Sequence, residues 1–235
     1  MLPIGVVFLN YQNEPRRPKQ ESILPRKIMK HIEISFDQSM IEHPQAYNCM
    51  SYFYKLILSD LPELIKGKVW ISGGIVRNWM LGEYLNTDID FFSSDKSKLA
   101  TLVYHLRNKY GFKPYLISKN AIKGTIKLKG KEVKVDIVKR LFENQQETIE
   151  NFDFTVCCFS TNGETFVYNE SAPFDLLRKR LVVNSLPYPV DTLKRLQRYI
   201  KKGYTACNGT LMTLAIEITK VDPNNTDLFD FYKFD

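Results

Sequence analysis

The spacing of apolar and polar positions divides most of the chain into short helices and strands. Apolar residues three to four apart predict helices over residues 44–58 and 75–85, and from about residue 185 the pattern is mostly helical. Another helix is predicted after Ser94 or Asp95, either of which can cap it, and Gly111 ends it.

Strands are predicted in the segments between these helices. Residues 69–71 form a short apolar run that leads into a Gly-Gly turn and then a helix, and residues 88–92 alternate as a strand. Two hairpins follow, over residues 125–138 and 154–168. The order strand, glycine turn, helix, strand is the part of the pattern that bears on chemistry.

The length of 235 residues corresponds to one domain with a small appendage. We expect an extended N-terminal arm plus a strand (1–43), a central domain (44–184), and a short helical segment with an aromatic tail (185–235). The arm is inferred from proline, since four of the eleven prolines lie in the first 25 residues.

Composition narrows the class of protein. With 44% apolar and 25% charged residues, the chain has ordinary globular usage. No apolar run approaches the roughly 18 residues of a membrane span, so we expect no signal peptide, no anchor and no membrane partner. Four scattered cysteines favour a reducing, cytoplasmic location, and three histidines without CxxC or HxxxH spacing offer no zinc site. A net charge of +7 is compatible with phosphate-rich partners.

Three aspartates are the candidate catalytic and metal-ligating residues. Asp88 and Asp90 are two apart on a strand and therefore point the same way, and Asp136 lies on the polar face of the first hairpin. If these strands are neighbours, the three carboxylates converge, and a cation is needed to relieve their repulsion. Carboxylate oxygens without His or Cys suit Mg²⁺ or Mn²⁺.

A phosphate-binding turn is predicted just before this strand. Ser72-Gly73-Gly74 lies at a strand-to-helix junction, where backbone N–H groups and the helix N-terminus favour an anion. Arg77, on the first turn of the helix, adds a charge-assisted contact. A triphosphate beside a carboxylate-held metal predicts nucleotidyl transfer from an NTP.

These residues resemble a known family. The run from Ile71 to Gly82, followed by Asp88-Ile89-Asp90, resembles the signature of the DNA polymerase beta-like nucleotidyltransferases, and within them the head domain of class II CCA-adding enzymes and bacterial poly(A) polymerases. The resemblance covers roughly residues 68–204. It implies an α+β fold, with a mixed sheet, flanking helices and a short helical C-terminal part. Asn78 stands where the family usually has aspartate.

Two later segments resemble nucleotide-contacting motifs of that family. Asp153-Phe154-Thr155-Val156 is similar to the ribose-contacting motif, although Asn151 and Phe152 replace the usual arginines. The segment that begins at Asp191 is similar to the nucleobase-reading motif, with lysine where arginine is usual. The predicted NTP contacts in these segments are Asp153, Asp191, Lys194, Arg195 and Arg198. A basic face made of Lys194, Arg195, Arg198, Lys201 and Lys202 is either a nucleic-acid-binding surface or, as is usual for such a face, only solvated.

Two hypotheses of function remain open. The first is an enzyme that transfers NMP from an NTP to an RNA, a protein or a small molecule. Because few residues follow Tyr204, we do not expect CCA addition, and the chain is closer in shape to short phage or bacterial nucleotidyltransferase-like proteins. The second is a structural or interaction subunit, for example of a bacteriophage particle, that contacts assembly partners through residues 1–27 and 226–235. The location is then host cytoplasm or virion.

Overall fold

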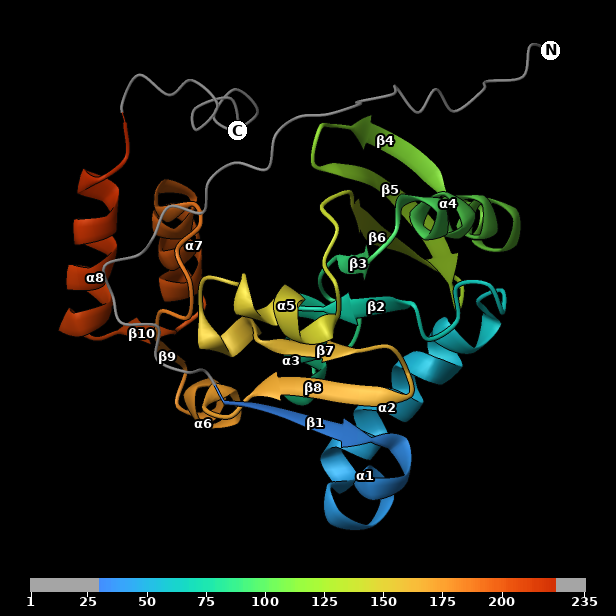
Figure 1. Cartoon of the computed structure of the whole chain (residues 1–235), viewed down its shortest axis with the longest axis horizontal. Helices are drawn as coiled ribbons and strands as arrows, with labels where there is room; N and C mark the ends of the chain where they lie inside the picture. The colour runs from blue at the N-terminus through green and yellow to red at the C-terminus, as the bar shows by residue number, and fades with distance from the viewer. Residues whose placement is uncertain (1–29, 223–235) are drawn as a thin grey trace.

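Residues 30–222, which the computed structural model describes, are built around one eight-stranded mixed sheet (Figure 1). The strand order is β1-β8-β7-β2-β3-β6-β5-β4, and β3 and β6 form the parallel pair in an otherwise antiparallel sheet. The bounds are β1 His31–Ser35, β2 Val69–Ser72, β3 Ile89–Ser93, β4 Lys113–Ile117, β5 Ala121–Leu128, β6 Lys131–Val138, β7 Phe159–Thr161 and β8 Thr165–Asn169. The predicted α+β class is confirmed. The predicted contact segments 1–27 and 226–235 lie outside the described residues.

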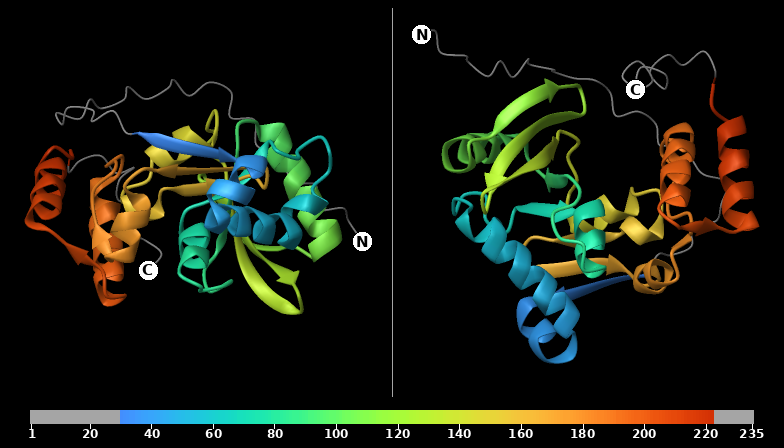
Figure 2. Two further views of the ribbon diagram at one scale, coloured as in Figure 1. Left: turned by 90° about the horizontal axis from the view of Figure 1, so that it is seen from below. Right: turned by 180° about the vertical axis from the view of Figure 1, so that it is seen from behind.

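Helices cover both faces of this sheet. Three of them, α2 (Pro44–Leu56), α3 (Gly74–Met80) and α4 (Lys96–Tyr110), pack on one face, and α5 (Gln145–Glu150) packs on the other against β2, β7 and β8 (Figure 2). The other helices are α1 Phe36–Glu42, α6 Ala172–Leu177, α7 Pro189–Lys201 and α8 Asn208–Thr219, with 3₁₀ turns at Leu58–Asp60 and Thr155–Cys157 and a small strand pair, β9 Arg180–Leu181 and β10 Thr205–Ala206. Within residues 30–222, no helix has the length and apolar character needed to cross a membrane.

Local chemistry explains the helix and hairpin that were predicted most closely. Asp95 caps α4, because its carboxylate accepts a hydrogen bond from the backbone N–H of Ser97 at 2.7 Å, and Gly111 ends the helix in the left-handed region at φ +65°. The hairpin of β5 and β6 turns at Lys129-Gly130, which have φ of +49° and +78°. A two-residue turn with both φ values positive sets the register of the two strands.

Two predicted elements are corrected by the structure. The helix predicted over residues 75–85 ends at Met80, because Gly82 and Leu85 take positive φ and the backbone N–H of Glu83 donates to the Asn78 carbonyl. The first strand of the hairpin predicted over residues 154–168 begins only at Phe159. Residues 155–157 instead form a 3₁₀ turn, held by bonds from the Cys157 and Cys158 N–H groups to nearby carbonyls.

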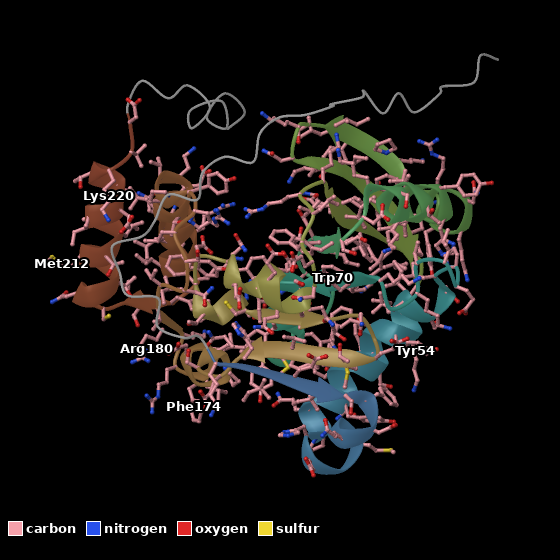
Figure 3. All side chains as sticks on the ribbon, in the orientation of Figure 1. Tyr54, Trp70, Phe174, Arg180, Met212 and Lys220 are labelled. Atoms are coloured by element: carbon pink, nitrogen blue, oxygen red, sulfur yellow. The ribbon has the colours of Figure 1, made fainter. Side chains whose placement is uncertain are left out.

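The side chains of the sheet divide between two cores. The main core lies under α2, α3 and α4, and its fully buried members include Phe53, Ile71 and Phe91. A smaller aromatic core of Trp70, Phe92 and Phe142 lies on the opposite face (Figure 3 labels Trp70). Trp70 is tied to α5 by a hydrogen bond from its indole N–H to Thr148 Oγ1 at 3.0 Å. This smaller core borders the face of the sheet that carries the aspartates.

Candidate active site

Asp90 and Asp136 are brought side by side by the parallel pairing of β3 and β6. In that register Asp90 lies opposite Asp136, and Ile89 lies opposite Val135. The apolar partners are fully buried in the main core, so the carboxylates point to the other face. Asp88 lies just before β3, close enough for its charge to act on Asp90. The expectation that these strands are neighbours is confirmed.

The electrostatics of this pair reflect burial and mutual repulsion. Burial, and then the charges of Asp136 and Asp88, raise the pKa of the Asp90 carboxyl to about 8. Lys123, on β5, opposes this shift and forms an ion pair with Asp136, with Nζ 2.5 Å from Oδ2. Lys123 was not among the predicted site residues, although the register of a hairpin that turns at Lys129-Gly130 places it opposite Asp136.

The carboxylate pair fits a hard divalent cation, but the three aspartates do not form a closed metal cage. The second oxygen of Asp136, Oδ1, is buried and has no hydrogen-bond partner, which leaves its lone pairs available to a cation. However, across residues 30–222 no group of three or more His, Cys, Asp or Glu side chains is arranged to hold a metal ion. The structure therefore brings Asp90 and Asp136 together as a carboxylate pair, and Asp88 lies just before β3.

Gly73 and Gly74, at the start of α3, differ in backbone conformation. Gly73 has φ +84° and ψ −131°, a conformation that is nearly restricted to glycine, and its N–H donates to the Phe159 carbonyl at 2.9 Å. A Cβ on Gly74 would lie 3.7 Å from Arg77 Nη2 and 3.8 Å from the Thr87 side chain, which is ordinary contact. Ser72 is buried, and its hydroxyl bonds to the Ser160 hydroxyl. A Cβ on Gly73 would also meet only ordinary contacts, with the Phe152 ring at 3.5 Å, so backbone conformation and not space distinguishes Gly73 from Gly74.

Arg77 is buried between α3 and α7. Its guanidinium donates to Asn78 Oδ1 at 2.8 and 2.7 Å, to the Tyr199 hydroxyl, and to Cys157 Sγ at 3.4 Å. It also lies 5.1 Å from the centre of the Tyr199 ring. Asn78 thus orients Arg77 with a neutral amide oxygen, although the family usually has aspartate there. None of these three partners is a carboxylate, so they leave the positive charge of Arg77 uncompensated beside Gly74.

Asp153 and Arg195, predicted from separate motifs, form an ion pair. Arg195 Nε lies 2.9 Å from Asp153 Oδ2, and this contact joins α7 to the segment before the 3₁₀ turn at 155–157. Burial raises the pKa of the Asp153 carboxyl, while the charge of Arg195 opposes that shift. Asp191 and Lys194 are partly exposed and Arg198 is exposed on the same helix. The four predicted contacts Asp191, Lys194, Arg195 and Arg198 therefore all lie on α7, and an ion pair joins Arg195 to Asp153.

Removal of Arg195 should destabilise the fold through Asp153. In Arg195→Met, a carboxylate that is only 5% exposed loses its cation, which should cost about 1–3 kcal/mol, reduced from the value for a fully buried pair because Arg195 is 40% exposed. Thermal unfolding should show a Tm lower by several degrees. Arg198→Met, on the exposed side of α7, is the matched control and should leave Tm unchanged. Adding Asp153→Asn to Arg195→Met should restore most of the loss, and no recovery would contradict this account.

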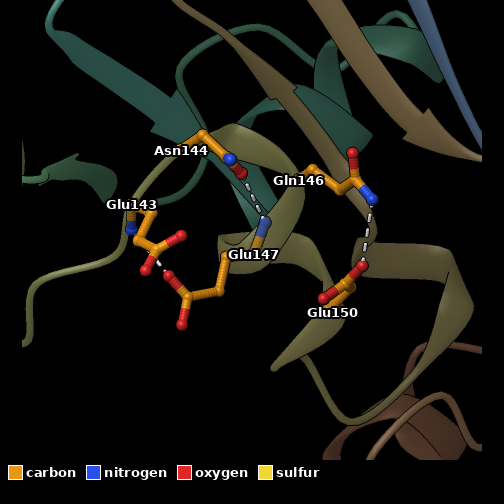
Figure 4. A pocket seen from close by; sticks show the side chains of 5 residues that line it. All are labelled: Glu143, Asn144, Gln146, Glu147 and Glu150. Atoms are coloured by element: carbon orange, nitrogen blue, oxygen red, sulfur yellow. Dashed lines mark hydrogen bonds between the residues drawn. The ribbon is translucent and has the colours of Figure 1, made fainter.

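A separate polar hollow lies away from these residues. It has a volume of about 330 Å³ and is lined by residues at the start of α5 and along it: Glu143, Asn144, Gln146, Glu147 and Glu150 (Figure 4). Its side chains satisfy one another, since Asn144 Oδ1 accepts from the Glu147 N–H at 2.8 Å and Gln146 donates to Glu150 at 3.2 Å. The hollow contains none of the predicted site residues.

Comparison with solved structures supports the same fold. The Thermotoga maritima CCA-adding enzyme complexed with tRNA is 19% identical, with a TM-score of 0.52, over 78% of this chain and 45% of that one. A CCA-adding enzyme in complex with ATP is 19% identical, with a TM-score of 0.54, over 80% of this chain and 47% of that one. The Bacillus stearothermophilus CCA-adding enzyme in complex with CTP is 15% identical, with a TM-score of 0.50, over 68% of this chain and 42% of that one. The chain therefore spans less than half the length of these enzymes. The likeness establishes the fold, that of the polymerase beta-like nucleotidyltransferases.

Sequence comparison adds a family. A family model described as Gabija anti-defense 2 family protein matches residues 44–179, which is more than half of the chain. The search of curated proteins found no match to this chain. The matched range runs from α2 to the turn after α6, and so it includes the glycine turn and all three aspartates.

Proposed function

Because this chain belongs to the Gabija anti-defense 2 family and has a nucleotidyltransferase fold, we propose that it counteracts a defence system by metal-dependent nucleotidyl transfer. NMP would pass from an NTP to an RNA, a protein or a small molecule. The observation that carries this proposal is the juxtaposition of Asp90 and Asp136 on parallel strands. Asp90 is next to Phe91, which pairs with Ile71 of β2, two residues before Gly73. Structural subunits have no need for two carboxylates held together at an energetic cost.

In the proposed reaction the residues of this chain bind and orient the substrates. Asp88, Asp90 and Asp136 would hold Mg²⁺ or Mn²⁺, which when bound polarises the phosphates and lowers the pKa of the attacking hydroxyl. Arg77, beside Gly74, would offset the negative charge of the triphosphate. Asp153 and Arg195, held together by their ion pair, would contact the ribose and base with Asp191, Lys194 and Arg198. The acceptor hydroxyl would lose its proton to solvent and form a bond to the α-phosphorus, while the bond from that phosphorus to the bridging oxygen breaks and pyrophosphate leaves.

A non-catalytic interaction protein is the second candidate. It is favoured by apolar side chains left exposed at one end of the molecule: on α8, Met212 is 65% exposed, and on α6, Phe174 is 65% and Leu177 79% exposed (Figure 3). Exposed apolar groups of this size are typical of surfaces that contact another protein. On this alternative, the family's anti-defence activity would rest on binding alone.

Labelled nucleotide transfer distinguishes the two candidates. The purified chain should be incubated with each α-³²P-labelled NTP, Mg²⁺ and an extract of the host cell, and labelled RNA, protein and small molecules should be separated. The enzyme proposal expects one labelled class, absent when EDTA replaces Mg²⁺ and absent with Asp90→Asn. A chain that binds its target equally well with or without Asp90, and labels nothing, would support the interaction protein.

A further inference from the structure

Much of the positive charge of the chain lies on three consecutive strands next to the carboxylates. Residues 113–138, which contain β4, β5 and β6, have seven lysines and two acidic residues, a net charge of +5 within a chain whose total is +7. The apolar side chains of β5 and β6 face α4 and the main core. The lysines therefore gather on and around the face that α4 leaves uncovered.

Strand register places several of these lysines in rows with the carboxylates. Residues opposite one another in adjacent strands share a face. One row runs from Asp90 through Asp136 to Lys123 and on to Leu116. The next row, two residues along, contains Lys134, Thr125 and Lys113, and a third pairs Lys127 with Glu132. Since strands lie about 4.8 Å apart, roughly 14 Å separates β3 from the edge strand β4.

We define this surface as the lysine face, made of Lys113, Tyr115, Lys123, Thr125, Lys127 and Lys134. Lys113, Lys127 and Lys134 are exposed. Tyr115 lies at the irregularity in the β4–β5 register, is 56% exposed, and is close enough to Lys123 to influence its pKa. An exposed aromatic ring among ammonium groups is the combination that binds single strands, because bases stack on the ring and phosphates contact the lysines.

We propose that the lysine face binds a single-stranded nucleic acid and leads its end to Asp90 and Asp136. The inference rests on the proposed function, for which it names the acceptor. Charge complementarity carries it, because a polyanion contacts lysines along β4, β5 and β6 while its terminal hydroxyl reaches the row that contains the carboxylates. Lys123 lies at the boundary, paired with Asp136 on one side and continuous with the basic rows on the other.

The test is fluorescence anisotropy with a short fluorescein-labelled oligoadenylate RNA, in EDTA and without NTP. The wild-type chain should bind with an affinity that falls with salt. Lys113→Gln, Lys127→Gln and Lys134→Gln combined should weaken binding at least tenfold. Each phosphate contact contributes about 0.7 to the salt slope of a single strand, so the slope should fall by about 2. Tyr115→Ala should weaken binding roughly tenfold with little change in slope.

The matched control removes the same number of charges elsewhere. Lys55→Gln, Lys96→Gln and Arg107→Gln combined alter exposed residues of α2 and α4, on the other side of the sheet. This variant should bind within twofold of wild type. If it weakens binding as much as the lysine-face variant does, or if wild-type chain does not bind the RNA, the inference is overturned.

Measurement of both RNA binding and labelled transfer product distinguishes failure of this inference from failure of the proposed function. If the lysine face is not the acceptor site, wild type and the lysine-face variant will form equal amounts of labelled transfer product from NTP. If transfer itself is wrong, the RNA will bind in a manner that depends on the lysine face, yet no nucleotide will be incorporated. In that outcome the binding surface stands and its role as an acceptor site is lost.

Discussion

Asp90→Asn should lower nucleotidyl transfer on the order of 10³-fold while making the folded chain more stable. Transfer falls because Asn removes one of the two paired carboxylates proposed to hold the metal. Stability rises because the native state no longer holds a buried carboxyl against the charges of Asp136 and Asp88. A structural residue gives the opposite pattern, in which activity and stability fall together. Initial rates with Mg²⁺ and thermal unfolding in EDTA measure the two effects.

The stability gain should depend on pH. In the folded chain the pKa of Asp90 is raised from 3.8 to about 8, so between about pH 4 and 8 the native state keeps a proton that the unfolded state has lost. The free energy of unfolding of wild type therefore falls as pH rises through this window and levels off above pH 8. Asp90→Asn lacks this loss, so its advantage in free energy of unfolding should grow from pH 5 to pH 8, reaching a few kcal/mol, and its advantage in Tm should grow with it.

The control for this prediction is Asp37→Asn on α1, which removes the same charge from an exposed position. It should leave both transfer and the pH profile as in wild type. Retained transfer in Asp90→Asn would contradict the active-site assignment, and an unchanged Tm difference between pH 5 and 8 would contradict the electrostatic account of the pair.

Substitution of the two glycines should separate backbone strain from ligand binding. Gly73→Val should cost about 1–3 kcal/mol, since φ +84° with ψ −131° is nearly closed to other residues, and Tm should fall by several degrees. Gly74→Val should leave Tm nearly unchanged, because its Cβ meets only ordinary contacts, yet it should weaken NTP binding at least about tenfold by filling the space beside the backbone.

Calorimetry with a non-hydrolysable NTP and Mg²⁺ measures the second effect. Gly209→Val is a matched control, because Gly209 is also near the start of a helix and a Cβ there meets only Cys207 Sγ at 3.7 Å. It should change neither NTP affinity nor Tm substantially. Equal NTP affinities for Gly74→Val and wild type would show that Gly74 only makes the turn.

Several elements were predictable from sequence because their determinants are local. Asp95 and Gly111 mark the two ends of α4, and a two-residue turn with positive φ defines the hairpin of β5 and β6. The prediction was wrong at residues 155–157, where residues that were predicted as a strand form a 3₁₀ turn. An apolar run shows that a segment is buried, but the bridge from Phe154 to Val183, far along the chain, decides its conformation.

The candidate site divides in the same way between sequence and tertiary structure. Residue alternation alone determined that Asp90 and Asp136 each lie on the strand face opposite to the apolar one, because the period of a strand is two. Asp88, predicted to share the face of Asp90, lies just before β3. Only the tertiary structure decided that β3 and β6 are neighbours, that Lys123 pairs with Asp136, and that Arg77 turns inward to Tyr199. Pairing between distant segments and the direction of a long side chain depend on contacts across the fold, which no local pattern contains.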